Sequence, residues 1–355
     1  MLNYKNFFSI HPFSLNMQKK QKWFLKNFKK LTKHHYKSCE EYKKISDRLF
    51  LNSNKYKKLS NIPFLQANLF KAFDLRSTDK KNLSKELTSS GTTGNLKSKI
   101  NLDMKTSLIQ SKALSSITAT IFKKDRLKIF IIDRDDILKG TNSLSAKAAA
   151  IKGFSQSFKE KTFLLDKNYN LKIDELKKFI KKNPDEEFVI FGFTSFIWQK
   201  LIMKLKNNKM SIEKNKGILV HGGGWKKMQD QKVSRDFFND KIYKKLGVKK
   251  IYNYYGMVEQ TGSIFLECSS GYFHTSIYSE IFIRDSNLKI CKNKTYGLIQ
   301  ILSLLPLSYP GHNILTEDIG AIEGLDDCKC GWKGKYFSIK GRVEGTEMKG
   351  CSDVN

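Results

Sequence analysis

The sequence has little negative charge, few cysteines and no long apolar run. Its 355 residues include 65 Lys and Arg but only 34 Asp and Glu, a formal net charge of +31. Six cysteines in a chain this long do not form a disulfide scaffold. The best apolar run, residues 188–198, contains Thr194 and Ser195 and is shorter than the roughly 20 residues of a membrane span. We therefore expect neither a disulfide-rich secreted protein nor a transmembrane segment.

The N-terminus does not have the pattern of a secretory signal peptide. Residues 7–15 are apolar only in part, because His11 and Pro12 interrupt them. Together with the cysteine usage, this predicts a cytoplasmic protein.

The excess of basic residues raises the question of an anionic partner. Residues 1–75 hold 16 basic and 4 acidic side chains, a balance that suits nucleic acid or an anionic membrane surface. The basic residues are mostly lysines spread along the chain, whereas sequence-reading nucleic-acid sites tend to use arginine. No nucleic-acid recognition motif accompanies them. We expect a solvated basic surface and no nucleic-acid partner, with a non-enzymatic basic binding protein as the competing interpretation.

The hydrophobic content of 40% and the aromatic content of 12% indicate a globular chain. Residues 14–50 predict one or two helices packed on the main body. Further helices are expected at residues 104–122, 143–158, 174–182, 196–205 and 233–246. Strands are expected at residues 127–133, 162–165, 188–193, 217–221 and 250–254, and beyond Gly262 at residues 279–284, 297–305 and 336–339. This alternation predicts an α/β fold with mostly parallel, helix-flanked sheets and a β-rich C-terminal portion.

A Ser/Thr/Gly-rich stretch at residues 88–94 is the first motif with chemical potential. Glycines let backbone N–H groups approach a ligand, hydroxyls donate to phosphate oxygens, and Lys97 adds a point charge. A flexible linker would have a similar composition. The residues that would contact phosphate are Ser89, Ser90, Gly91, Thr92, Thr93 and Gly94. Because a helix is predicted from residue 104, we expect the phosphates near a helix N-terminus.

Three further motifs follow predicted strands or a turn. Gly222, Gly223 and Gly224 make room for a flat ligand, although a tight turn needs the same residues. Aromatic faces can stack on a base and a carboxylate suits Mg²⁺, which singles out the segment containing Tyr254, Tyr255, Gly256 and Glu259. Asp318 precedes a glycine, as turn residues often do, and Arg342 follows Gly341.

In order and type, these motifs resemble those of the adenylate-forming ligases. Residues 87–103 resemble most closely the loop of LuxE-type acyl-protein synthetases, and the resemblance runs from about residue 35 to the C-terminus. It implies that the loop and Lys97 bind the phosphates of ATP and that the triple glycine lies beside adenine. It also implies that Glu259 binds Mg²⁺ and that Asp318 and Arg342 bind the ribose side of the nucleotide. Val258 departs from the family pattern, which has threonine at this position.

The resemblance also implies a domain plan. We expect a basic helical segment at residues 1–75, an α/β adenylation core at 76–262 and a β-rich portion at 263–345 that completes the nucleotide site. A short tail at residues 346–355 follows, and the small C-terminal lid domain of the superfamily is expected to be truncated or absent.

The cysteines divide into two groups. Cys268, His274, Cys328 and Cys330 are soft ligands in the number that a tetrahedral Zn²⁺ site needs, although the C-x-C spacing is tighter than usual. Ordinary reduced thiols are the alternative. Cys351 lies in a basic tail, where a neighbouring lysine favours its thiolate. By resemblance it is the acyl acceptor, and an incidental terminal thiol is the alternative.

The predicted function is therefore ATP-dependent activation of a fatty or other organic acid as acyl-AMP, followed by transfer to Cys351. The resemblance implies ATP and Mg²⁺ as cofactors and a partner acyl-protein reductase. A ligase that loads coenzyme A or a carrier protein, as in the phenylacetate-CoA ligases, is the alternative enzyme.

Overall fold

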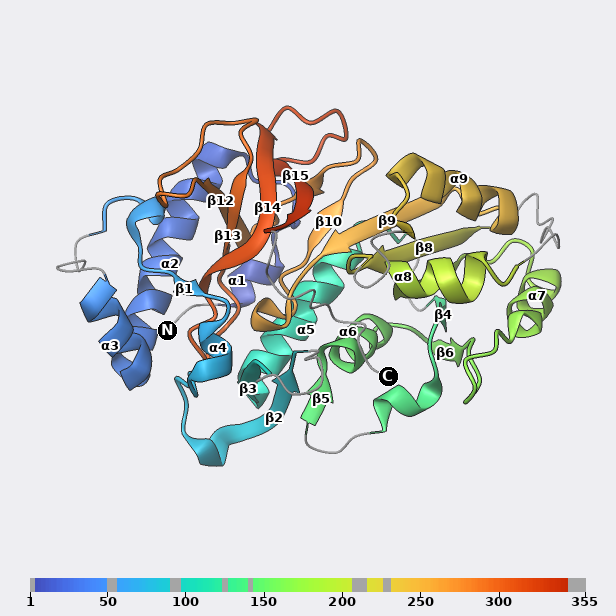
Figure 1. Cartoon of the computed structure of the whole chain (residues 1–355), viewed down its shortest axis with the longest axis horizontal. Helices are drawn as coiled ribbons and strands as arrows, with labels where there is room; N and C mark the ends of the chain where they lie inside the picture. Colours follow the sequence, from blue (N-terminus) through green and yellow to red (C-terminus); the bar gives the residue numbers. More distant parts are fainter. Residues whose placement is uncertain are drawn as a thin grey trace.

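The computed structural model describes most of the chain. The described residues are 4–49, 56–89, 97–122, 127–139, 143–205, 216–225 and 231–343. Figure 1 shows their arrangement, with N-terminal helices at one end of a large sheet and the helices α7 and α9 at the other.

One long sheet carries the architecture. Its hydrogen-bonded order is β12 (Ser279–Arg284), β13 (Gly297–Ser303), β14 (Asn313–Leu325), β15 (Lys335–Arg342), β11 (Phe273–His274), β10 (Phe265–Glu267), β9 (Lys250–Tyr255), β8 (Gly217–Gly222), β7 (Phe188–Phe193), β4 (Lys128–Ile131) and β6 (Glu160–Phe163). A short strand, β1 (Leu65–Gln66), pairs in parallel with β14. From β9 to β6 every pairing is parallel, whereas from β12 to β9 every pairing is antiparallel.

The parallel half is buried on both faces because its central strands are apolar at successive positions. In β7, Phe188 and Ile190 pack with one set of helices, while Val189 and Phe191 pack with another. Successive side chains of a strand point to opposite faces, so a continuous apolar run requires a cover on each side. The first cover is α7 (Ile173–Lys182), α8 (Thr194–Phe196) with the π-helical turn Ile197–Ile202, and α9 (Arg235–Leu246). The second is α5 (Met104–Thr118) and α6 (Ala146–Ser155), and the same apolar cluster continues to α2 (Met17–Ser38), which lies at the other end of the sheet.

A second, smaller sheet lies beside α5 and α6. Its order is β3 (Lys99–Asp103), β2 (Leu83–Thr88) and β5 (Ser143–Ser145), with β2 and β3 antiparallel and β2 and β5 parallel. Its buried side chains, Leu87, Ile100, Leu102 and Leu144, join the core of the antiparallel half. The segment that connects β2 to β3 contains the predicted phosphate loop.

The remaining helical elements are short or cover the antiparallel half. They are α1 (Lys5–Phe8), α3 (Glu40–Leu49) and α4 (Leu69–Ala72), with 3-10 turns at Leu59–Asn61, Lys80–Asn82, Asp135–Leu138 and Val258–Gln260. The two helices α2 and α3 agree with the prediction for residues 14–50. At position 262, where the sequence predicts a domain boundary, the large sheet is continuous because β9 pairs with β10. The domain plan stays a prediction.

Several predicted elements differ from the structure. The helix expected at residues 143–158 begins as strand β5, because these residues pair with β2 and Ser145 then caps α6 by accepting a hydrogen bond from Ala148 N at 3.1 Å. The phosphate loop does not lead directly into a helix, since β3 separates it from α5. The helix expected to reach residue 122 ends at Thr118, and Asp318 lies inside the long strand β14 rather than at a turn.

Candidate functional site

The base of the predicted phosphate loop is fixed by two hydrogen bonds. Ser89 N donates to the carbonyl of Ser98 at 3.1 Å, and Ser98 N donates to Ser89 Oγ at 2.9 Å. These bonds continue the β2–β3 ladder by one step and close the loop at its neck. Lys97 is exposed beside this neck. Ser90, Gly91, Thr92, Thr93 and Gly94 lie outside the described residues, and their phosphate role stays a prediction.

Glu259 lies against this neck. It sits in the 3-10 turn Val258–Gln260, which follows β9, and its side chain is buried and hydrogen-bonded by the Ser98 side chain. Burial raises the pKa of Glu259, while Ser98, Arg342 and Lys71 act in the opposite direction. A carboxylate is a ligand type that suits Mg²⁺, and the metal role of Glu259 stays a prediction.

Asp318 is the centre of a second group. Tyr255 Oη donates to one carboxylate oxygen at 2.6 Å, and Arg342 Nε donates to the other at 2.9 Å. The pairing of β14 with β15 places Asp318 directly opposite Arg342. Burial and the adjacent carboxylate raise the pKa of Tyr255 well above its usual range, so its hydroxyl remains a donor. The structure thus brings three predicted nucleotide-binding residues into contact.

The three glycines occupy different surroundings at the end of β8. A side chain at Gly222 would collide with the ring of Tyr254, the residue opposite it on β9. Gly223 has φ +72°, a conformation that favours glycine, and its carbonyl accepts a hydrogen bond from Thr194 Oγ1 at 2.8 Å. At Gly224, a Cβ atom would have no described neighbour within 4 Å. Close packing explains the first glycine and backbone conformation the second, and the flat-ligand role of the loop stays a prediction.

Of the two predicted aromatic residues, Tyr254 is buried and Tyr255 is half-buried. The Tyr254 ring is buried and packs on Phe154, with ring centroids 4.8 Å apart. It belongs to the core, and it also forms part of the wall of a cavity. Gly256 lines the same cavity. His221, one residue before the glycines, is buried against Thr194 at 2.9 Å, and burial lowers its pKa to about 3, so it acts as a neutral structural residue.

The cavity has a volume of about 140 Å³ and lies between α5, α6, β2 and the end of β9. Most of its wall is apolar. The apolar residues include Leu87, Leu114, Leu144, Ala149, Phe154 and Ile264. Gly223 and Gly256 also line it, so it adjoins the glycine loop and the Tyr255 segment. Apolar cavities with a polar edge are typical of small-molecule sites.

The polar face of α5 at this cavity is a part of the site that the sequence motifs do not include. Ser107, Gln110 and Ser111 all line it, and Gln110 Nε2 also donates to Tyr309 Oη at 3.1 Å. Their spacing of three and four residues places them on one face of a helix whose other buried positions are mostly apolar. That spacing is the signal by which they could have been found.

The four soft ligands also come together. The ligand atoms of Cys268, His274, Cys328 and Cys330 lie within 4.8 Å of one another, at the opposite end of β15 from Arg342. A Cys/His cluster that could hold a metal ion is therefore present. It is separate from the group around Asp318.

Comparison with known proteins decides the family. The family described as "Acyl-protein synthetase, LuxE" matches residues 4–355. The chain belongs to the LuxE acyl-protein synthetase family. A search of curated protein sequences gives no match.

Solved structures show that this LuxE-family chain has the fold of adenylate-forming ligases. A crystal structure of 2-hydroxyisobutyryl-CoA ligase with 2-HIB-AMP and CoA, in its thioesterification state, has a TM-score of 0.73 and 13% identity. That match covers 94% of this chain and 70% of that chain. An open conformation of the same ligase has a TM-score of 0.71 and 12% identity, covering 94% and 77%. The predicted fold class, a mixed α/β chain with a large sheet flanked by helices, is confirmed.

Two expectations for the LuxE-family chain concern the tail and the membrane. Cys351, the predicted acyl acceptor, lies outside the described residues and stays a prediction. Within the described ranges, the structure contains no helix with both the length and the apolar character to cross a membrane.

Proposed function

We propose that this protein is an ATP-dependent acyl-protein synthetase that activates a carboxylic acid as an acyl adenylate and then transfers the acyl group to its own cysteine. The observation that carries the proposal is the family match over residues 4–355. The contacts among Tyr255, Asp318 and Arg342 and the position of Glu259 at the loop neck support it.

In the first step, a carboxylate oxygen of the acid attacks the α-phosphorus of ATP, and pyrophosphate leaves with the bridging oxygen. The loop at residues 88–94 and Lys97 hold the pyrophosphate part, where hydroxyls, backbone N–H groups and a cation stabilise the charge that develops there. Glu259 would hold Mg²⁺, which supplies positive charge to phosphate oxygens when bound. Asp318 accepts from the ribose hydroxyls, and Arg342 and Tyr255 keep its carboxylate oriented.

The acid occupies the cavity between α5 and α6. The apolar wall of this cavity suits an alkyl or aryl group. Gly223 and Gly256 line the edge of the cavity, so the bound acid would lie next to the proposed nucleotide site. The hydroxyl of Ser111 and the amide of Gln110 are polar groups on this wall that can orient the acid.

In the second step, the Cys351 thiolate attacks the acyl carbon of the adenylate, AMP leaves, and a thioester remains on the chain. An acyl-protein reductase is the proposed partner that receives this acyl group. The similarity to a CoA ligase favours one alternative, in which an external thiol such as CoA attacks instead.

Two variants test the two steps separately. Cys351→Ala should retain acid-dependent ATP–pyrophosphate exchange but lose hydroxylamine-sensitive acyl labelling of the chain, because only the second step needs the thiol. Asp318→Asn should raise the KM for ATP in the exchange reaction about 10-fold or more, since it loses a charged acceptor. Both are measured with a panel of carboxylic acids of increasing length.

Each outcome separates the alternatives. If Cys351→Ala labels normally, the acceptor is another residue, and label found only on added CoA supports the CoA ligase. Absence of exchange with every acid in the folded wild-type protein contradicts adenylation itself. Cys291→Ala, which changes a half-buried cysteine between β12 and β13, is the matched control and should behave as wild type in both assays.

A further inference from the structure

Two tight turns bring the four soft ligands together. In the first, Gly271 N donates to the carbonyl of Cys268 at 2.9 Å, and in the second, Gly331 N donates to the carbonyl of Cys328 at 3.0 Å. Both glycines have positive φ, +82° and +86°. Each turn thus begins with a cysteine and closes on a glycine three residues later. The first turn connects β10 to β11 and the second lies between β14 and β15.

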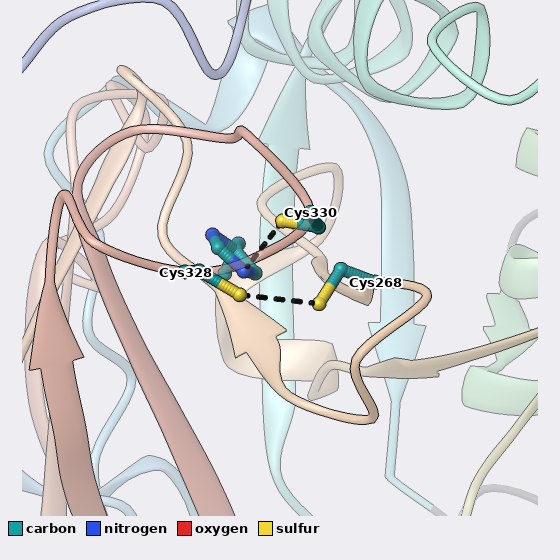
Figure 2. A group of neighbouring side chains, drawn as sticks. Cys268, Cys328 and Cys330 are labelled. Carbon is teal, nitrogen blue, oxygen red and sulfur yellow. Dashed lines mark hydrogen bonds between the residues drawn. The ribbon is translucent and has the colours of Figure 1, made fainter.

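The side chains from these turns point toward one another. Figure 2 shows the sulfurs of Cys268 and Cys328 facing each other across the two turns, with Cys330 beside them. Cys268 Sγ lies 3.8 Å from Cys328 Sγ, and Cys330 Sγ lies 3.4 Å from His274 Nε2. The His274 ring is buried, and no described residue other than Cys330 gives either of its nitrogens a hydrogen-bond partner.

These two separations are close to those in a tetrahedral metal site, and all four ligand atoms lie within 4.8 Å of one another. With Zn–S bonds of ~2.3 Å and Zn–N bonds of ~2.0 Å, a regular tetrahedron places two sulfurs ~3.8 Å apart and a sulfur and a nitrogen ~3.5 Å apart. A disulfide would require sulfurs ~2.0 Å apart. Three thiolates and one imidazole are soft ligands that select Zn²⁺ over the hard cations. A backbone N–H, that of Trp332, also donates to Cys330 Sγ at 3.4 Å.

We infer that Cys268, His274, Cys328 and Cys330 bind one structural Zn²⁺, which fastens the β10–β11 hairpin to the β14–β15 connection. All four coordination positions come from the protein, so the site is closed to substrate. Residues 268 and 330 are far apart in sequence, so the metal links two turns that are distant along the chain.

The site also anchors the N-terminal segment. The Trp332 ring stacks on Phe13 with centroids 4.1 Å apart and meets the edge of His274 at 5.3 Å. Lys333 N donates to the carbonyl of Phe13 at 2.9 Å, and the Asp326 carboxylate accepts from Met17 N at 2.9 Å. Loss of the metal therefore frees the turn on which the start of α2 rests.

The test is metal analysis of the full chain, purified with reductant and without added metal. Wild type should contain about one zinc per chain. Cys268→Ser and Cys328→Ser should each lose it and should become sensitive to proteolysis before residue 17, because the anchoring turn loosens. Cys291→Ser, a matched control outside the cluster, should keep both the zinc and the resistance.

A second measurement tests the inference even if the cysteine variants do not fold. Cobalt(II) added to chelator-treated wild type should give the absorption of a tetrahedral thiolate complex at one equivalent, and zinc should displace it. Wild type with neither zinc nor a cobalt spectrum overturns the inference. A Cys268–Cys328 disulfide in place of zinc, in wild type purified with reductant, overturns it too, as does zinc that survives in both variants. None of these readouts depends on the ligase activity.

Discussion

At the scale of single residues, the two neighbours of Asp318, Arg342 and Tyr255, have different roles. Arg342 faces it across the β14–β15 pair and carries the compensating charge. Tyr255 comes from β9 and donates the shortest hydrogen bond of the group, 2.6 Å. A carboxylate with one fixed donor on each oxygen keeps one orientation, which leaves its remaining lone pairs directed at a ligand.

Tyr255→Phe tests this positioning role. The variant removes the hydroxyl that donates to Asp318 and leaves the ring packing in place. Hydrogen bonds to charged groups contribute about 1.5–3 kcal/mol, so the KM for ATP in pyrophosphate exchange should rise about 10-fold or more, with kcat changed less. Tyr252→Phe alters another tyrosine of β9 and should leave the KM unchanged. Equal KM values for wild type and Tyr255→Phe would remove Tyr255 from the nucleotide site.

The residue types of this site can be predicted from the sequence, but their contacts cannot. Asp318 and Arg342 are candidates because residue type and motif order are visible in the chain itself. The Tyr255–Asp318 contact joins residues 63 positions apart. It depends on the whole order of β9, β10, β11, β15 and β14, which periodicity does not specify.

At the scale of elements, the sequence predicts a strand or helix well where the local signal is strong. Strand β7 has the predicted bounds, since five apolar residues with a glycine among them have no solvated face. The strands β2 and β5 are absent from the prediction because their residues are mostly polar and half-buried. They form strands through tertiary pairing, β2 with both β3 and β5, and a propensity argument does not include those partners.

The long helix α2 depends on a buried ion cluster. Lys20 Nζ lies 3.5 Å from one carboxylate oxygen of Glu280, and Lys335 Nζ lies 3.2 Å from the other. Lys20 also donates to Thr275 Oγ1 at 2.8 Å. Burial lowers the pKa of Lys20 to about 8, which shows how poorly solvated the cation is. Glu280 therefore neutralises two lysines that are largely shielded from water.

Glu280→Gln should destabilise the protein by about 3–5 kcal/mol, because two buried cations lose their shared carboxylate. The measurement is the free energy of unfolding in urea at neutral pH. Glu160→Gln is the control: its ion pair with Lys128 is exposed on the glutamate side, and its loss should cost less than about 1 kcal/mol. Similar effects from the two variants would mean that the cluster does not anchor α2.

At the scale of the whole molecule, the N-terminal helices and the β-rich portion form one packed unit. Thr32 Oγ1 lies 3.2 Å from His312 Nε2, and His35 Nδ1 lies 2.8 Å from Ser77 Oγ. The rings of His35 and His312 are 4.6 Å apart, and both are buried. Two imidazoles in contact within a core have no solvent to stabilise a positive charge, so folding requires both to be neutral.

This requirement predicts a loss of stability in mild acid. Burial lowers the pKa of His312 to about 3, and it does the same to His221, a buried histidine of β8 that is not part of this pair. In the unfolded state both have the ordinary value of 6.5. Below pH 6.5 the unfolded chain binds protons that the folded chain does not, so stability is full above pH 6.5 and falls as the pH drops toward 3. His312 and His221 should each lower the free energy of unfolding by about 2 kcal/mol between pH 7.5 and pH 5.

The slope of stability against pH identifies the contribution of His312. In His312→Gln, the loss between pH 7.5 and pH 5 should be about 2 kcal/mol smaller than in wild type, whatever the variant's stability at pH 7.5. Tyr42→Phe removes a hydroxyl 3.5 Å from His312 Nε2 but no histidine, so it should lower stability without changing this slope. Urea unfolding at a series of pH values measures both. A slope in His312→Gln equal to that of wild type would mean that His312 takes up a proton in the folded protein, and that the buried histidine pair tolerates a charge.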